Sequence, residues 1–75
     1  MLKQMNDGII NTKHIVKIYF KDDNTLAVSD INNCEMLIKF KKPINDRKYF
    51  FDLFNLELQD PDVDEIDFES ILEEL

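Results

Sequence analysis

Apolar and polar residues alternate with a period of two along three segments in the first half of the chain, at 15–21, 25–29 and 34–41. This period is typical of strands, because successive side chains of a strand point to opposite faces. Short Asp- and Asn-rich stretches separate the segments, and such side chains stabilise tight turns. The pattern predicts an antiparallel meander with one wet face. The residues expected on its buried face are Val16, Ile18, Phe20, Leu26, Val28, Cys34, Met36, Ile38 and Phe40.

The apolar period changes to that of a helix after Pro43, which ends the last strand because it cannot donate to a strand ladder. Asn45 or Asp46 is the expected N-cap, since either side chain can accept hydrogen bonds from the first N–H groups of a helix. Apolar residues then recur three and four positions apart, which predicts a stripe that can pack on the apolar face of the sheet. The stripe comprises Phe50, Leu53 and Phe54. Leu56–Leu58 is too short to distinguish a strand from a continuing helix.

A second, acidic helix is predicted near the C-terminus, after a break at 59–61. Residues 62–65 resemble a capping box, in which Glu follows the cap residue by three positions. One helical face then carries Phe68, Ile71, Leu72 and Leu75. With a short strand at 9–10, the expected fold class is α+β: a three- or four-stranded antiparallel meander, one packed helix and a C-terminal acidic helix. We expect a meander-plus-helix domain at 1–58 and, at 59–75, an acidic linker and amphipathic helix packed on that domain or extending from it.

Charge is distributed unevenly along the chain. The 75 residues include nine Lys or Arg and sixteen Asp or Glu, a formal net charge of −7. Residues 1–48 hold all nine basic residues, whereas residues 49–75 hold ten acidic residues and no basic one, a net charge of −10. Such a negative potential repels nucleic acid and membrane phosphates and attracts basic protein surfaces. An alternative is that the acidic end is a solvated tail that keeps a small protein soluble.

The residue types needed for catalysis are scarce. The chain has one His (His14), one Cys (Cys34) and one Gly (Gly8). A nucleophile–base pair needs two groups within hydrogen-bond reach, a zinc site needs paired Cys or His residues, and a phosphate-cradling loop needs glycines. We therefore expect no enzyme activity, no cofactor and no metal, with Cys34 as a structural thiol in the core. A single Cys, with no apolar run long enough for a signal peptide or membrane span, predicts a cytoplasmic protein.

One metal alternative comes from Asp60, Asp62 and Asp64, which have the one-three-five oxygen spacing that opens a calcium loop. The sixth position of such a loop is normally Gly and the twelfth Glu, whereas this chain has Glu65 and Ile71 there. The spacing therefore favours an acidic cap and linker over a calcium site.

Over residues 8–54 the order of these features resembles, at the level of pattern, that of small flagellar-operon proteins of the FlbD type. In that family an Asn precedes an Ile-x-x-Ile strand, which two further strands and a closing helix follow. The matching positions here are Asn11, Ile15, Ile18, Leu26–Val28 and Phe50–Phe54. The resemblance implies a non-enzymatic cytoplasmic module. In size and charge the chain is also similar, as a class, to small acidic phage-type inhibitors of nucleic-acid machinery, including anti-CRISPR-like proteins.

These observations predict a protein that binds another protein without catalysis. The acidic end would engage a basic surface that normally holds nucleic acid, so that the chain acts as a nucleic-acid mimic or competitive inhibitor. The apolar part of the acidic helix has the spacing of a helix that docks in a groove, although the same face could close the core of the domain itself. The residues expected to contact the partner are Asp60, Asp62, Asp64, Glu65, Asp67, Phe68, Glu69, Ile71, Leu72, Glu73 and Glu74.

Two other functions stay open. An adaptor or homodimer would use surplus apolar residues, because excess apolar surface often marks an interface; these residues are Tyr49, Phe51, Leu56 and Phe68. Direct nucleic-acid binding would use strand lysines that could share one sheet face, and the attached acidic segment argues against it; these lysines are Lys17, Lys21, Lys39 and Lys41.

Overall fold

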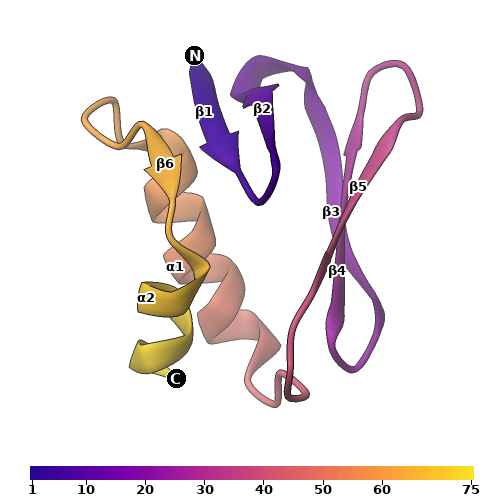
Figure 1. Cartoon of the computed structure of the whole chain (residues 1–75), viewed down its shortest axis with the longest axis vertical. Helices are drawn as coiled ribbons and strands as arrows, with labels where there is room; N and C mark the ends of the chain where they lie inside the picture. The colour runs from indigo at the N-terminus through magenta and orange to yellow at the C-terminus, as the bar shows by residue number, and fades with distance from the viewer. The chain divides into compact units, whose positions relative to one another are not determined.

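The computed structural model describes residues 1–75 and divides them into two compact units. Unit 1 consists of residues 1–12 and 46–75, and unit 2 consists of residues 13–45. These borders differ from the expected ranges 1–58 and 59–75, because the first strands of the chain fold together with the helices. The predicted α+β class is confirmed, with an antiparallel meander, a packed helix and a C-terminal helix (Figure 1).

Unit 2 is a three-stranded antiparallel sheet in the order β3-β4-β5, as the period-two pattern predicts. Its strands are β3 (Ile15–Asp22), β4 (Thr25–Asp30) and β5 (Glu35–Lys39), and a short 3-10 helix, Thr12–His14, precedes them. Figure 1 shows β3, β4 and β5 as a twisted meander.

Both hairpin turns use aspartate side chains, as predicted. Asp22 Oδ1 accepts a hydrogen bond at 3.0 Å from the backbone N–H two residues later, and this bond is the main cause that lowers the pKa of Asp22. In the second turn, Asp30 Oδ1 accepts from the N–H groups of Asn32 at 2.8 Å and Cys34 at 3.0 Å. Asn33 has a φ of 63°, in the left-handed region that Asn tolerates better than most residues.

The predicted inward residues of β4 and β5 lie on the buried side of unit 2, but the alternation holds only along β5, because Thr25 and Ala27 of β4 are buried as well. Two rows of inward side chains cross the sheet, because Ile18 pairs with Val28 and Val28 with Met36, and Phe20 pairs with Leu26 and Leu26 with Ile38. Leu26, Val28, Ile38 and Phe40 are buried, and Ile18, Phe20 and Met36 are half-buried.

Two members of the predicted buried face, Val16 and Cys34, are exposed, so this part of the prediction is wrong. The pairing register shifts between Ile15 and Lys17, which leaves Val16 in a bulge with 61% of its surface exposed. Cys34 lies in the turn because β5 begins one residue later. A bulge adds a residue and reverses the alternation locally, which a strictly periodic pattern does not reveal.

Unit 1 contains a second three-stranded sheet, in the order β2-β1-β6. Its strands are β1 (Leu2–Met5), β2 (Gly8–Asn11) and β6 (Glu65–Ile66). β1 pairs antiparallel with β2 and parallel with β6. The predicted strand at 9–10 is therefore present, but it belongs to this sheet and not to the meander. The sequence pattern did not predict β1 and β6, because strands of four and two residues are too short to show a period.

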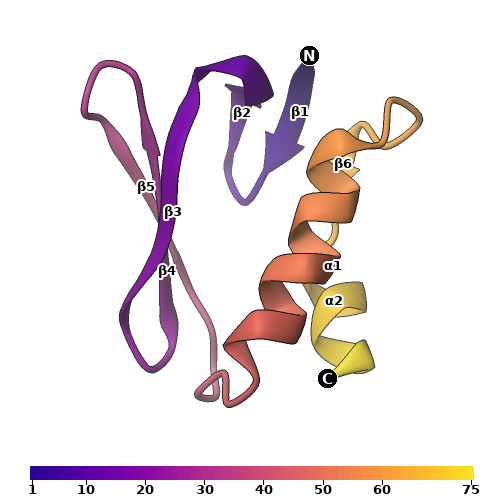
Figure 2. The same cartoon turned by 180° about the vertical axis from the view of Figure 1, so that it is seen from behind.

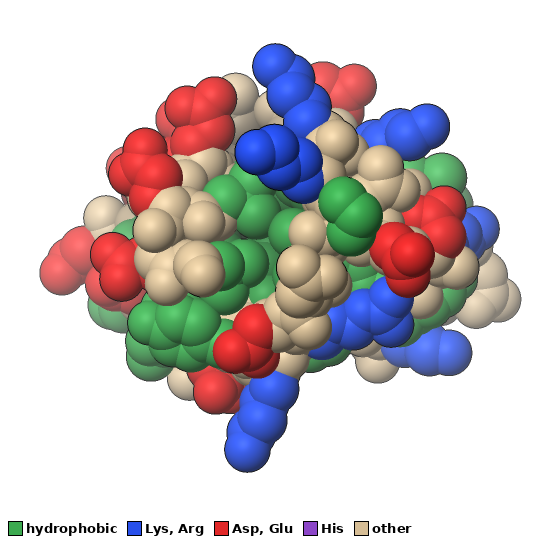
Figure 3. Space-filling model, turned by 90° about the horizontal axis from the view of Figure 1, so that it is seen from below, with side chains coloured by type: hydrophobic (Ala, Val, Ile, Leu, Met, Phe, Trp, Pro, Cys, Tyr) green, Lys and Arg blue, Asp and Glu red, His purple; other side chains and the backbone are tan.

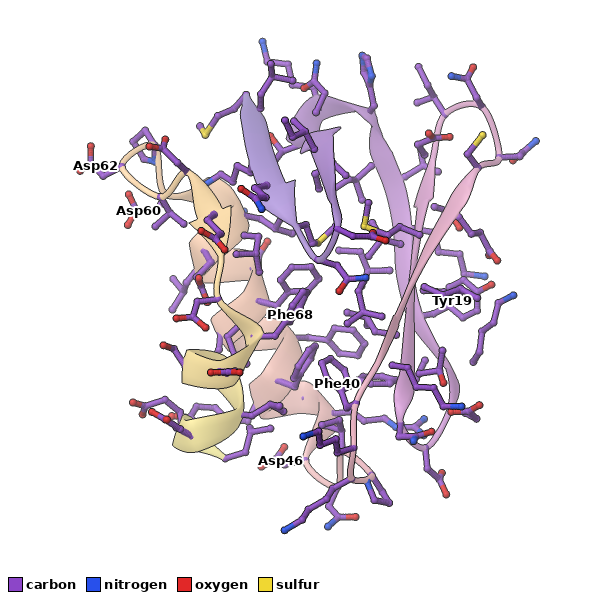
Figure 4. All side chains as sticks on the ribbon, in the orientation of Figure 1. Tyr19, Phe40, Asp46, Asp60, Asp62 and Phe68 are labelled. Atoms are coloured by element: carbon purple, nitrogen blue, oxygen red, sulfur yellow. The ribbon has the colours of Figure 1, made fainter.

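Helix α1 (Arg47–Gln59) begins after Asp46, one of the two predicted caps. Asp46 Oδ1 accepts a hydrogen bond from the N–H of Tyr49 at 3.0 Å, and Figure 4 shows Asp46 at the start of the helix. The helix includes Leu56–Leu58, so the strand alternative for this segment is wrong. It ends at Asp60, whose N–H donates to the carbonyl four residues earlier at 3.1 Å.

Helix α2 (Phe68–Glu74) begins later than the capping-box pattern at 62–65 predicts. Its cap is Asp67, whose carboxylate accepts from the N–H of Ser70 at 3.2 Å and from the Ser70 hydroxyl at 2.8 Å. Both bonds lower the pKa of Asp67, and the bond from the Ser70 hydroxyl has the larger effect. Residues 62–65 instead run from the turn after α1 into β6, so the capping-box prediction is wrong.

Aromatic rings from both helices form the core of unit 1. The Phe68 ring lies parallel to that of Phe50, with centroids 6.4 Å apart and an interplanar angle of 2°, and its centroid lies 5.5 Å from that of Phe54. Phe50 and Phe54 are 0% and 1% exposed, which confirms the predicted helical stripe at these positions. Figure 2 shows α2 beside α1, and Figure 4 shows Phe68 pointing toward α1.

A lysine is buried in the same unit. Lys3, in β1, is 1% exposed, and its Nζ donates to the carbonyl oxygens of Glu57 and Asp60 at 2.5 Å each. Both carbonyls belong to the C-terminal end of α1, where helix carbonyls lack an intrahelical donor and the helix dipole is negative. Lys3 therefore ties β1 to the end of α1. The sequence pattern does not predict this role.

Candidate functional site

The candidate site is the acidic segment, which we define as residues 60–74. The acidic segment contains β6, which pairs with β1, and α2, which packs on α1 through Phe68. Much of the segment therefore lies on secondary structure. Figure 3 shows several acidic side chains, in red, on the left of the view. Its eight carboxylates are all exposed; they are those of Asp60, Asp62, Asp64, Glu65, Asp67, Glu69, Glu73 and Glu74.

The acidic segment is not neutralised by the basic side chains of unit 1, since no ion pair joins them. Unit 1 has twelve acidic residues and three basic ones, Lys3, Arg47 and Lys48, a formal net charge of −9. The ammonium group of Lys3 is buried and bonds backbone carbonyls. The exposed surface of unit 1 therefore has a strong negative potential.

The apolar members of the predicted partner-binding set lie against the core of unit 1. Phe68 stacks on Phe50, Ile71 is 3% exposed and Leu72 is half-buried. Of the two alternatives for this helical face, closing the core of the chain itself is the one that the structure shows. Phe68 and Ile71 are therefore not available as anchors for a partner's groove in this arrangement.

A shallow hollow of about 510 Å³ lies beside the acidic segment in unit 1. It brings together three predicted contact carboxylates, from β6, from the cap of α2 and from the first turn of α2. Such a hollow can accept a Lys or Arg side chain, whose apolar stem packs on apolar atoms while its charged end meets the carboxylates. The lining residues are Asn6, Glu65, Ile66, Asp67, Phe68 and Glu69.

The strand lysines of unit 2 are only partly brought together. Lys17 and Lys39 are exposed on β3 and β5, and the strand register puts them on the same face of the sheet. Lys41 lies beyond the end of β5. Lys21 forms an ion pair with Glu35, with Nζ 2.8 Å from Oε1. A carboxylate among these lysines lowers the positive potential that nucleic-acid binding needs.

Glu35 accepts hydrogen bonds from three side chains of unit 2. Its carboxylate is bonded by Lys21, by the Tyr19 hydroxyl and, at 3.2 Å, by the Ser29 hydroxyl. The bond from Lys21, followed by that from Tyr19, lowers the pKa of Glu35 from 4.5 to about 2, and the bond to Glu35 raises the pKa of Tyr19.

The low pKa of Glu35 predicts that unit 2 loses stability in acid. A folded-state pKa of about 2 against an ordinary 4.5 means that the contribution is complete above pH 4.5 and is lost as the pH falls through about 2. We expect the side-chain carboxyl resonance of Glu35 to titrate in NMR with a midpoint near pH 2. Tyr19→Phe should raise this midpoint, and Glu35→Gln should flatten the pH dependence of unfolding below pH 4.5. A midpoint of 4.5 in the unsubstituted chain would contradict the network.

Metal-ligating and nucleophilic side chains are dispersed. No group of three or more His, Cys, Asp or Glu side chains is placed to hold a metal ion. Asp60 Oδ1 accepts a hydrogen bond from the N–H of Asp62 at 2.9 Å, which is the geometry of an aspartate-stabilised turn. Figure 4 shows these two residues at the loop between α1 and β6. His14 ends the 3-10 helix and Cys34 lies in a hairpin turn, and both are exposed.

Two aliphatic residues of the small sheet, Leu2 and Ile9, have no functional role predicted from the sequence pattern. They are 67% and 72% exposed, the highest values among the large apolar side chains of the chain. The available signal was weak, because each lies in a strand of four residues whose sequence does not alternate apolar and polar positions.

Comparisons with known proteins give no match. No protein-family model matches the chain, and neither a curated protein nor a solved structure matches it. None of its helices has the length and apolar character needed to cross a membrane.

Proposed function

We propose that this chain is a non-enzymatic, cytoplasmic protein-binding module whose acidic segment engages a basic, nucleic-acid-binding surface of a partner protein. It would act as a nucleic-acid mimic or competitive inhibitor, in the manner of small acidic phage-type, anti-CRISPR-like proteins. The observation that carries the proposal is the set of eight exposed carboxylates of the acidic segment, four of them on β6 and α2, with none of the eight paired with a basic side chain of unit 1.

Electrostatics would supply the recognition. A formal charge of −9 on unit 1 attracts a surface rich in Lys and Arg and accelerates its association. The hollow next to Asp67 offers one place where a basic side chain of the partner can be received. Nucleic acid would compete for the same partner surface, because phosphates and carboxylates form charge-assisted hydrogen bonds with the same Lys and Arg side chains.

The end of α2 supports a binding role for its carboxylates. Glu73 and Glu74 lie in the last turn of the helix, where the helix dipole disfavours negative charge. Neither side chain makes a hydrogen bond or ion pair within the chain that would offset this cost. Their charge therefore does not serve the stability of the helix, and a role in contacting a basic partner would account for it.

The proposal is tested by the salt and nucleic-acid dependence of binding. The full chain is immobilised and probed with proteins that heparin retains from a cell extract. We expect retained proteins to be released by duplex DNA or RNA, and their affinity to fall about tenfold or more between roughly 0.05 M and 0.5 M salt. Retention that neither salt nor nucleic acid reduces would overturn the proposal.

A charge variant tests how much the acidic segment contributes to binding, compared with the rest of the chain. Asp62→Asn/Glu73→Gln/Glu74→Gln removes three exposed charges whose side chains make no hydrogen bond in the structure. We expect it to weaken retention and to remain folded by circular dichroism. Asp7→Asn, outside the acidic segment, is the control and should have a much smaller effect. Equal effects of the two variants would contradict a role for the acidic segment.

An adaptor or homodimer is the second candidate. Two of its four predicted residues, Tyr49 and Leu56, are 39% and 65% exposed on α1, whereas Phe51 is half-buried and Phe68 packs in the core. Sedimentation velocity at high salt distinguishes the two functions, because an apolar dimer persists there and an electrostatic complex does not.

A further inference from the structure

The β2-β1-β6 sheet has one buried face and one open face. Lys3 and Met5 on β1 are 1% and 0% exposed, and Ile66 on β6 is 4% exposed. Side chains alternate along a strand, so the neighbours of these residues point the other way. Leu2 and Ile9 lie on that opposite face and are 67% and 72% exposed. The sheet therefore presents two large aliphatic side chains to the solvent.

The strand register places these aliphatic residues on the same face of the sheet as an acidic residue. Ile9 is paired with Gln4, and Gln4 is paired with Glu65, so the three residues form one row across the sheet. Leu2 and Asn11 form a second row on the same face. We call these five residues the open face; it is apolar toward β2 and acidic toward β6.

The open face is continuous with the acidic segment. The N–H of Gln4 donates to the carbonyl oxygen of Asp64 at 2.8 Å, so the turn that carries the first acidic residues is bonded to the same sheet. Figure 1 shows β1 and β6 side by side, with the turn after α1 leading into β6. A partner that contacts the carboxylates of this turn therefore contacts a segment bonded to the sheet that carries Leu2 and Ile9.

We infer that the open face is the apolar part of the partner-binding surface and that it receives an amphipathic basic segment. An aliphatic or aromatic side chain of that segment packs on Leu2 and Ile9, while its Lys or Arg side chains meet Glu65 and the acidic segment. This inference rests on the proposed function. Buried apolar contacts surrounded by charged pairs are the arrangement in which a few residues carry most of the binding free energy.

Charge complementarity selects this occupant over a second copy of the chain. A symmetric dimer through the open face would bring two units with a formal charge of −9 each together around Glu65. Like charges at an interface oppose association, whereas a basic segment neutralises them.

The test compares two peptides binding to the full chain. One is an amphipathic helical peptide of Leu and Lys, and the other has the same Lys residues with Ser in place of Leu. We expect the Leu-containing peptide to bind about tenfold more tightly by isothermal titration calorimetry. Leu2→Thr/Ile9→Thr should remove this difference and lower affinity for the Leu-containing peptide about tenfold.

A matched control is available in unit 2. Val16 is 61% exposed and lies in a strand, so Val16→Thr makes the same kind of change elsewhere and should leave both affinities unchanged. Circular dichroism should show all variants folded, because the substituted side chains are exposed. Loss of affinity for the Leu-containing peptide in Val16→Thr as well would overturn the inference.

The outcomes separate this inference from the proposed function. If both peptides bind equally, and only the triple charge variant of the acidic segment weakens them, the open face is not part of the site while the acidic surface still binds. If the two threonine substitutions change the sedimentation of the chain alone, the face is an interface between copies and the inference is overturned. If neither peptide binds, both proposals are overturned.

Discussion

Replacing Phe50 with Ala is expected to lower the free energy of unfolding by about 3–5 kcal/mol. Phe50 is 0% exposed, and its ring centroid lies 6.0 to 6.4 Å from those of three other phenylalanine rings. The substitution removes the transfer free energy of the ring, leaves a cavity and deletes these aromatic contacts. A small domain has a total stability of roughly 5–15 kcal/mol, so the variant should be close to its unfolding transition.

Urea denaturation followed by far-UV circular dichroism measures this change. Tyr49→Ala is the control, because it removes an aromatic ring from the neighbouring position of the same helix, where 39% of the side chain is exposed. We expect it to cost no more than about 1 kcal/mol. Similar losses for Phe50→Ala and Tyr49→Ala would show that the packed rings are not the core of unit 1.

The elements that could be predicted from sequence are those with local signals. The meander, both of its turns, and the stripe and cap of α1 all depend on residues within a few positions of each other, such as Asp46 and Tyr49. The prediction of the start of α2 was wrong because a long-range strand pairing competes with the local capping pattern. Residues 62–65 satisfy a capping-box pattern, but pairing of β6 with β1 takes up part of this segment and Asp67 caps the helix instead.

The small sheet could not be predicted, because its parallel pair joins segments about sixty residues apart. β6 has two residues and is defined only by its pairing with β1. No period exists in so short a strand, and the partner cannot be inferred from either segment alone. The exposed face of this sheet, with Leu2 and Ile9, was missed for the same reason.

The candidate site divides in the same way. The exposure of the carboxylates at 60–74 follows from composition, since charged side chains rarely lie inside a fold unless they are paired. The orientation of the apolar face of α2 does not follow from the sequence. A helical apolar stripe has the same sequence pattern whether it packs on its own chain or on a partner. In the structure the apolar face of α2 packs on the aromatic rings of α1, with Phe68 stacked on Phe50, and so belongs to the chain's own core.

Lys3 shows how a polar residue can be required inside such a core. Its ammonium group replaces water as the donor for two carbonyls at the end of α1, at 2.5 Å each, and lies at the negative end of the helix dipole. A buried charge carries a desolvation cost that hydrogen bonds offset only in part. The net contribution of Lys3 to the free energy of unfolding therefore depends on the cost of leaving the two carbonyls without a donor.

Lys3→Met keeps most of the apolar stem and deletes the ammonium group. We expect it to lower the free energy of unfolding by roughly 2–4 kcal/mol, because each partly buried carbonyl that loses its donor costs about 1–3 kcal/mol and the relieved desolvation of the lysine offsets part of the sum. Lys3→Ala should cost about 1–2 kcal/mol more, since it also removes the buried stem. The difference between the two variants in urea denaturation therefore separates the packing of the stem from the bonds of the ammonium group.

Lys48→Met is the matched control, because Lys48 is exposed in the first turn of α1 and the change is chemically identical. It should alter stability by no more than about 0.5 kcal/mol. If Lys3→Met instead leaves stability unchanged or raises it, the cost of burying the charge equals or exceeds the value of its two bonds. In that case β1 would be held to α1 by apolar packing alone, and the loss in Lys3→Ala would measure that packing.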